Sequence, residues 1–168
     1  MSVTEPLGFA AAGVHAGIRR EKKDLALVRT LGDGTGAAMW TRNRVLAAPV
    51  VVSQQHLACA EPQAVVVNSG VANAATGEQG VKDARTTAEH AAALLGLAPE
   101  QVLVLSTGVI GAPLPVGLVT AGLDAAALEL STDGGAGAAA TPPKPVSAGS
   151  ADRSQRAPRS SSATAIAP

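Results

Sequence analysis

The stretch AVVVNSG, residues 64–70, is the part of this sequence that best predicts a fold. Its apolar residues are mostly β-branched and Asn-Ser-Gly ends the run, which is typical of a buried strand that stops in a polar turn. The run QVLVLS at 101–106 is similar, and it continues into STGVIG at 106–111. Between the two runs, apolar residues of 81–95 recur at helical spacing and Gly96 ends the helix.

A second helix is expected after Pro115, because Val116, Val119, Leu123 and Ala126 again recur at helical spacing. Strand, helix, strand and helix therefore alternate over residues 64–130. This alternation predicts a layered α/β fold of sheet and helices.

Three further extended stretches are predicted nearer the N-terminus. They are KDLALV (Lys23–Val28), GAAMWT (Gly36–Thr41) and RVLAAPVVVS (Arg44–Ser53). Pro49 lies inside the third stretch, which places it at a sheet edge or a bulge. The following SQQHLA is expected to form only a short helical turn.

Composition divides the chain into two parts. Residues 1–130 have the aliphatic content of one folded domain, whereas Ser131–Pro168 is rich in Ala, Pro and Ser and holds only two large aliphatic residues. Such a segment cannot bury enough apolar surface to offset its ordering entropy. We therefore expect a low-complexity, disordered segment from residue 131 onward.

Charge argues against a nucleic-acid or membrane-surface partner. The 13 basic and 13 acidic residues give a formal net charge of zero, so no broad basic surface is expected. The densest basic cluster is RREKK (Arg19–Lys23), which we interpret as a solvated loop or strand end, with contact to a phosphate as the minor alternative.

Residues 101–123 contain no charged side chain and are long enough to cross a bilayer. Six glycines and prolines interrupt the stretch, so a strand, a loop and a helix fit it better than a membrane span.

Cys59 is the only cysteine, and the N-terminus lacks the pattern of a signal peptide. We expect a cytoplasmic protein.

Two alternatives for reactive side chains carry little weight. His56 and Cys59 are three residues apart and could share a helical face, but a metal site needs more ligands than two, and the three histidines show no ligand spacing. No metal site is predicted. Cys59 as a nucleophile lacks an evident base.

The polar loop NSGVANAATG, residues 68–77, follows the predicted buried strand directly and combines amides, hydroxyls and glycines. Asn68, Ser69 and Asn73 are therefore candidates for contact with a substrate. A capped turn that leads into the next helix explains the same composition equally well. In STGVIG, a glycine N–H beside a threonine hydroxyl could converge on a developing oxyanion.

Four segments occur in order and at fitting separations: KKDLALV, TRNRVLAAPVVVSQQ, AVVVNSGVANAATGEQG and LSTGVIGAPLP. Together they resemble the N-terminal, α-chain part of the glutamate N-acetyltransferase (ornithine acetyltransferase) family of arginine biosynthesis. The resemblance covers about residues 7–130.

The resemblance implies an α/β fold and a precursor that cleaves itself before an internal threonine. That threonine accepts acetyl from N-acetylornithine and passes it to glutamate, and some members also use acetyl-CoA as the donor. No bound cofactor is implied. By position in the motif, Thr107 and Gly108 are implied to form the oxyanion hole, and a second, β chain of the same family is the implied partner.

The sequence also departs from the family pattern. Val71 stands where members usually have asparagine, and TPPK (Thr141–Lys144) matches only faintly a threonine-rich substrate-binding stretch. The nucleophilic threonine has no identifiable counterpart, so the chain is expected to be incomplete and inactive alone. Two alternatives stay open: a non-catalytic remnant or partner of a complete paralogue, and a small α/β ligand-binding domain.

Overall fold

The computed structural model describes residues 2–141, in which four strands form one mixed sheet. The strands lie in chain order: β1 (Phe9–Val14), β2 (Leu25–Thr30), β3 (Ala64–Val71) and β4 (Val102–Val109). β2 pairs antiparallel with both β1 and β3, whereas β3 and β4 are parallel. Since β3 and β4 are parallel, their carboxyl ends lie side by side at the same end of the sheet.

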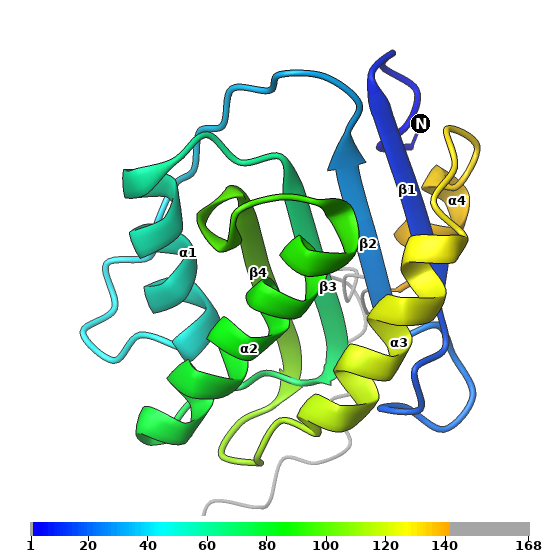
Figure 1. Ribbon diagram of the computed structural model, residues 1–168. Helices are drawn as coiled ribbons and strands as arrows, with labels where there is room; N and C mark the ends of the chain where they lie inside the picture. The colour runs from blue at the N-terminus through cyan, green and yellow to red at the C-terminus, as the bar shows by residue number, and fades with distance from the viewer. Residues whose placement is uncertain (1, 142–168) are drawn as a thin grey trace, which may run out of the picture.

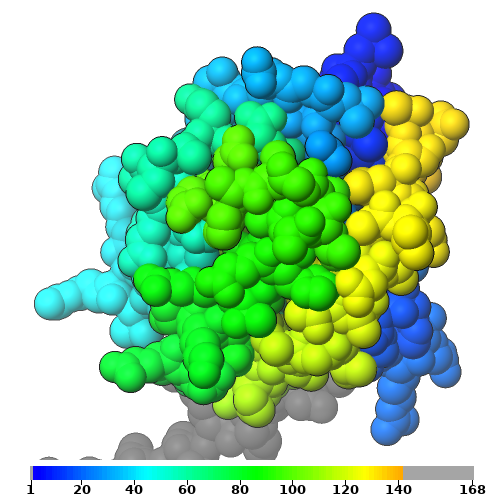
Figure 2. Space-filling view, in the orientation of Figure 1, coloured from blue at the N-terminus to red at the C-terminus, as the bar shows by residue number. Residues whose placement is uncertain are grey.

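The helices gather on one face of the sheet (Figure 1). They are α1 (Ala48–Cys59), α2 (Gly77–Leu95) and α3 (Val116–Leu128), with a 3₁₀ turn (Pro99–Gln101) before β4. The short α4 (Gly135–Ala139) lies beside β1. Figure 2, in the same orientation, shows α2 and α3 closing over this face. The largest fully buried apolar residues of this core are Leu25, Leu27, Val52, Val66, Val102, Val119 and Leu123.

The α/β fold predicted from residues 64–130 is confirmed. β3, α2, β4 and α3 all occur where periodicity predicted them, and KDLALV lies in the loop before β2 and the start of β2. β1 was not predicted, because FAAAGV is short and alanine-rich. It forms because all of Ala10–Val14 is buried against β2, α3 and α4.

The extended conformation predicted for Arg44–Ser53 is wrong, because Ala48–Cys59 is a helix. Pro49 occupies the first turn of α1, where its missing N–H costs nothing. The run of valines suggested a strand, but Val52 is fully buried in the helix-face core and the two valines before it, Val50 and Val51, are half-buried. Tertiary burial outweighs the modest helix penalty of β-branched residues.

The strand predicted at Gly36–Thr41 is also wrong, since residues 33–43 contain no helix or strand. No neighbouring strand pairs with this stretch within the described residues, and a strand without a ladder leaves its backbone groups unpaired. Met39 is 99% exposed and Trp40 is 38% exposed. The apolar residues of this stretch therefore belong to a loop beside the edge strand and not to a strand.

The disordered segment was predicted to begin at residue 131, but residues 131–141 are ordered. The Ser131 N–H and C=O bond to Ala11 of β1, at 3.2 and 2.9 Å. Gly134 lies so close to Ala11 that a Cβ there would overlap the Ala11 carbonyl. The Thr141 hydroxyl, fully buried, donates to the Leu25 carbonyl at 3.3 Å. Residues 131–141 are therefore ordered by close backbone packing rather than by large side chains; residues 142–168 lie outside the described part.

Within residues 2–141, no helix is long and apolar enough to cross a membrane. In that same part of the chain, no group of three or more His, Cys, Asp or Glu side chains could hold a metal ion.

Candidate functional site

The site predicted from STGVIG lies where β3 and β4 end together. The register pairs Ser69 with Thr107 and Gly70 with Gly108. Because side chains alternate along a strand and Val104 faces the helices, Thr107 and Ser69 project from the opposite face of the sheet, which we call the open face. The structure therefore brings Ser69 beside the predicted oxyanion pair.

The backbone conformation at the glycine pair leaves no room for a side chain on Gly108. Gly70 has a φ of +119° and Gly108 a φ of +139°, values that L residues rarely adopt. A Cβ on Gly108 would overlap the carbonyl group of Gly70. Glycine is therefore required at position 108 by the packing of the strand end as well as by its backbone conformation.

The backbone of β4 presents the Gly108 N–H to the outer edge of the sheet. β4 is an edge strand, and the Val109 carbonyl accepts a hydrogen bond from Ala72 on the β3 side at 2.9 Å. The N–H and C=O of Val104 point the other way, where both bond to the Ser53 hydroxyl of α1 at 2.9 and 2.8 Å. Alternation places the Gly108 N–H on that same outer side.

Thr107 is half-buried, and within residues 2–141 no hydrogen bond involves its hydroxyl. The hydroxyl on the open face and the N–H of the next residue at the outer edge are two hydrogen-bond donors at the same strand end. Ile110 follows this pair on the exposed surface at 69% exposure. The geometry is compatible with the predicted oxyanion role of Thr107 and Gly108, and that role stays a prediction.

Asn68, a predicted substrate-loop residue, is buried and bonds inside the protein. Its Nδ2 donates to the Val71 carbonyl at 2.9 Å, and its Oδ1 accepts from the Ser106 hydroxyl at 2.5 Å. These bonds tie the ends of β3 and β4 together just before the glycine pair. Asn68 holds the strand ends in place; its contact with a substrate stays untested.

Asn73 likewise organises the loop before α2. Its side chain is fully buried, donates to the Gly80 carbonyl at 2.8 Å and accepts from the Thr76 hydroxyl at 2.7 Å. Asn73 also has a φ of +46°, which asparagine tolerates better than most residues. These bonds hold the turn that leads into α2, although the N-cap residue Thr76 makes no side-chain cap hydrogen bond, and contact of Asn73 with a substrate stays untested.

The basic cluster at Arg19–Lys23 lies in the loop between β1 and β2, at the same end of the sheet as Thr107. Asp24, fully buried, accepts the backbone N–H of Ala16 at 2.6 Å and that of Arg19 at 2.7 Å. Arg19 is thereby turned inward, and its Nη1 lies 3.5 Å from the Ser69 hydroxyl. The solvated-loop interpretation holds for the exposed residues 20–23 but not for half-buried Arg19.

Sequence reasoning missed Asp24 and Arg19 as parts of this site. The available signal was an acidic residue directly before an apolar strand, in KKDLALV, which indicates a carboxylate that caps a loop.

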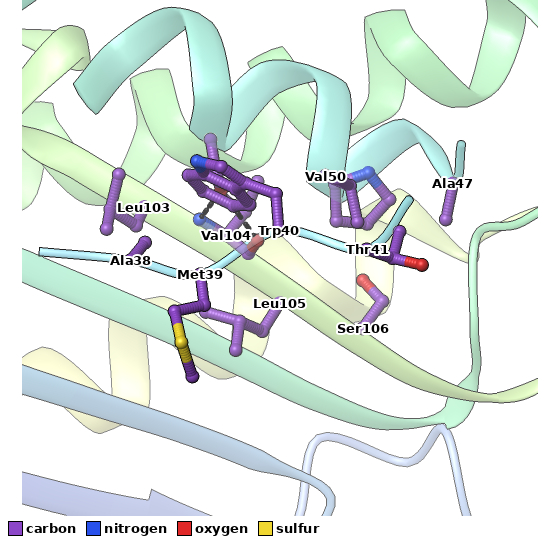
Figure 3. A pocket seen from close by; sticks show the side chains of 12 residues that line it. Ala38, Met39, Trp40, Thr41, Ala47, Val50, Leu103, Val104, Leu105 and Ser106 are labelled. Carbon is purple, nitrogen blue, oxygen red and sulfur yellow. Dashed lines mark hydrogen bonds between the residues drawn. The ribbon is translucent and has the colours of Figure 1, made fainter. Parts of the chain in front are cut away.

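A mostly apolar pocket of about 400 Å³ lies along the outer edge of β4 (Figure 3). Trp40 and Met39 leave the 36–41 loop on opposite sides, and Trp40 lies over β4. The pocket reaches Ser106, two residues before Gly108, on the edge to which the Gly108 N–H points. Its lining residues are Ala38, Met39, Trp40, Thr41, Ala47, Pro49, Val50, Ser53, Leu103, Val104, Leu105 and Ser106.

His56 and Cys59 do not combine into a site. His56 is buried and its Nδ1 donates to the Val102 carbonyl at 2.8 Å, which anchors α1 to β4. Cys59 is an exposed free thiol at the end of α1.

Comparison with known proteins finds relatives in the ArgJ family. Residues 10–151 match the ArgJ family. The arginine biosynthesis bifunctional protein ArgJ of Thermobifida fusca is 53% identical over 143 residues, which are 83% of this chain and 37% of that protein. The ArgJ protein of Caldanaerobacter subterraneus is 50% identical over 134 residues, 80% of this chain and 33% of the relative. The chain thus spans about a third of the length of these curated relatives.

Two solved structures share this fold. Ornithine acetyltransferase of Mycobacterium tuberculosis, complexed with ornithine, superposes with a TM-score of 0.80 at 44% identity, covering 83% of this chain and 77% of that one. The ArgJ protein of Bacillus halodurans superposes with a TM-score of 0.78 at 37% identity, covering 84% and 74% of the two chains.

Proposed function

This chain belongs to the ArgJ family, and on that premise we propose that it supplies the oxyanion-binding part of an acetyltransferase site. The observation that carries the proposal is the end of β4, where the half-buried Thr107 hydroxyl is followed by the outward-facing N–H of Gly108. Two such donors at one strand end are what a tetrahedral acyl intermediate requires.

In the proposed reaction, a threonine hydroxyl attacks the acetyl carbonyl carbon of N-acetylornithine. The carbonyl π electrons move to oxygen, and this oxyanion accepts hydrogen bonds from Thr107 and Gly108. Collapse breaks the C–N bond, and the departing ornithine amine takes up the proton that the threonine hydroxyl gave to its base. The amine of glutamate then attacks the threonine ester through a second oxyanion at the same place, which yields N-acetylglutamate and restores the threonine.

The nucleophilic threonine and its base are proposed to come from a second segment of the family, the β chain. Two observations support a partner at this place: the chain spans about a third of its relatives' length, and the open face carries apolar residues. Leu105 is 49% exposed and Val109 is 61% exposed next to Thr107. Acetyl-CoA is an alternative donor of the same acetyl carbonyl in this proposal.

The test uses a complete relative in which residues 10–141 of this chain replace the equivalent segment of the Thermobifida fusca protein. Thr107→Ala removes one oxyanion donor, so we expect kcat to fall by roughly 10²–10³. The KM should change little, because the oxygen is fully charged only in the transition state. Thr107→Ser is the matched control, since it keeps the hydroxyl.

The acetyl-transfer rate is measured together with the thermal midpoint of each variant. A Thr107→Ala rate within about threefold of the parent, well inside the expected oxyanion effect, would show that this threonine only ends a strand. An unaltered midpoint would exclude a loss of folding as the cause of any large decrease.

A further inference from the structure

The two edges of the sheet are closed to different extents. At the β1 edge, the N–H and C=O of Ala11 both bond to Ser131, and α4 packs beside the strand. At the β4 edge, α1 closes only the first half, where the Ser53 hydroxyl bonds both outward groups of Val104. Within residues 2–141, no hydrogen-bonded cover of this kind extends over residues 105–109 of β4, which we call the open edge.

The open edge carries unpaired backbone groups. Ser106 and Gly108 direct their N–H and C=O groups outward, and within residues 2–141 no hydrogen bond takes these groups. Such an edge is a template for pairing with another strand, which proteins usually prevent with a charged side chain or a proline. No charged residue stands between positions 101 and 123, and no proline stands between 102 and 112. The formal net charge of zero adds no overall repulsion between two copies of the chain.

An exposed apolar side chain and an apolar pocket flank the open edge. Ile110, the residue directly after β4, is 69% exposed. The pocket of about 400 Å³ lies beside Val104 at the other end, with Trp40 and Val50 among its lining residues (Figure 3). In extended backbone, residues six positions apart face the same side of the sheet and lie about 20 Å apart. Ile110 therefore faces the side of Val104 but cannot fill the pocket of its own chain.

A two-fold axis at Thr107 would satisfy the open backbone groups of two copies at once. Antiparallel pairing about this residue sets Ser106 opposite Gly108 of the second copy, and Gly108 opposite Ser106 of the second copy. Residues with outward N–H and C=O groups then face each other, so each of the two pairs exchanges two backbone hydrogen bonds. The same patch serves both copies, as a two-fold interface requires.

This register also covers the exposed apolar side chains. Leu105 lies opposite Val109 of the second copy on the open face, where they are 49% and 61% exposed in the single chain. One step further, Ile110 of the second copy lies opposite Val104, on the side where α1 and Trp40 wall the pocket. The ladder ends there, because the outward groups of Val104 are already bonded to α1.

The apolar surface at the open edge is enough for a small specific interface. Five partly or fully exposed apolar side chains line it. Fully exposed side chains of this size present roughly 150–200 Å² each, so their exposed fractions amount to roughly 500 Å² per copy. The resulting total of about 1,000 Å² is the lower limit for a specific interface between proteins. The five residues are Met39, Trp40, Leu105, Val109 and Ile110.

We propose that a second copy of this chain occupies the open edge, paired antiparallel about Thr107, with Ile110 of each copy in the pocket of the other. In this pair, the Gly108 N–H donates to the Ser106 carbonyl of the second copy. That N–H is then withdrawn from any other acceptor, so self-pairing and the binding of an acyl oxygen exclude each other. The pairing itself does not depend on the proposed function.

Sedimentation velocity of the full 168-residue chain over a concentration series measures the pairing. We expect a reversible dimer with a Kd in the micromolar range, since the interface is small. Ile110→Lys puts a charge into the apolar pocket and should raise the Kd at least about tenfold. Ala38→Phe should raise it by filling the pocket. Leu128→Lys is the matched control: it makes a similar change at an exposed residue of α3 and should dimerise like the parent.

Disulfide cross-linking tests the register. The experiment uses a Cys59→Ser background, because Cys59 is an exposed free thiol. At the two-fold axis, the Cα atoms of two Thr107→Cys residues lie about 4.5 Å apart, within the range of a disulfide. Two Leu105→Cys residues are offset by four positions, about 13 Å, and cannot be bridged. With oxidised glutathione as the oxidant, we therefore expect a linked dimer from Thr107→Cys and none from Leu105→Cys.

Three results would each overturn the proposal. They are a monomer at every concentration up to about 100 µM, an unchanged Kd in Ile110→Lys, and equal cross-linking at positions 105 and 107. Far-UV circular dichroism checks that each variant is folded. If Ala38→Phe fails to fold, Ile110→Lys and the two cysteine variants decide the question. The oxyanion test measures a rate in a complete relative and this one a mass, so either proposal can fail without the other.

Discussion

Asp24→Asn is the substitution that best tests how the loop between β1 and β2 is held. Asp24 is fully buried, and its two oxygens accept the backbone N–H groups of Ala16 and Arg19 at 2.6 and 2.7 Å. Its own backbone N–H and C=O bond to Val14 and Ser69, and these two bonds do not depend on the side chain. The substitution therefore isolates the two side-chain bonds.

The expected loss follows from the bonds that asparagine can and cannot replace. A hydrogen bond to a charged group contributes about 1.5–3 kcal/mol and a neutral one about 1 kcal/mol. Asparagine keeps one carbonyl acceptor, but its NH₂ group then faces the second backbone N–H, which loses its partner. We expect the free energy of unfolding to fall by about 2–4 kcal/mol, a large part of the stability of a typical domain.

Urea denaturation of the full chain, followed by circular dichroism, measures this change. Asp33→Asn is the matched control, since it makes the same chemical change on an exposed loop residue and should alter stability by no more than about 0.5 kcal/mol. Equal effects of the two substitutions would refute the argument, because the buried carboxylate would then contribute no more than a solvated one.

Three further substitutions test other parts of the fold by denaturation. Gly108→Ala should destabilise by about 2 kcal/mol or more, because φ is +139° and the new Cβ would overlap β3; a neutral effect would show that the strand ends separate easily. Ser53→Ala leaves the N–H and C=O of Val104 without their α1 partner and should cost about 1–3 kcal/mol, whereas no loss would mean that water replaces the hydroxyl. Gly134→Ala should also destabilise by about 1–3 kcal/mol through overlap with Ala11, and unchanged stability would indicate that residues 131–141 contribute nothing to the fold.

Local pattern was sufficient where the intrinsic propensity of an element agrees with the burial of its residues. The β-branched run of β3 and the helical spacing of α2 each lie in a setting that agrees with their own propensity, so periodicity predicted both. The motif STGVIG likewise predicts a candidate site from local sequence alone. A threonine followed by a glycine at a strand end supplies a hydroxyl and an N–H as hydrogen-bond donors, independent of the surrounding fold.

Packing between segments that are distant in sequence determined the features that local pattern did not predict. The valines of α1 favour a strand by propensity, yet burial of Val52 against the sheet makes the segment helical. Residues 131–141 have few large side chains and are ordered because small residues allow their backbone to contact β1. Arg19 belongs to a cluster that charge alone assigns to solvent. It reaches Ser69, fifty positions away in sequence, because a buried Asp24 fixes the loop, and only the folded chain brings that carboxylate, the loop amides and the end of β3 together.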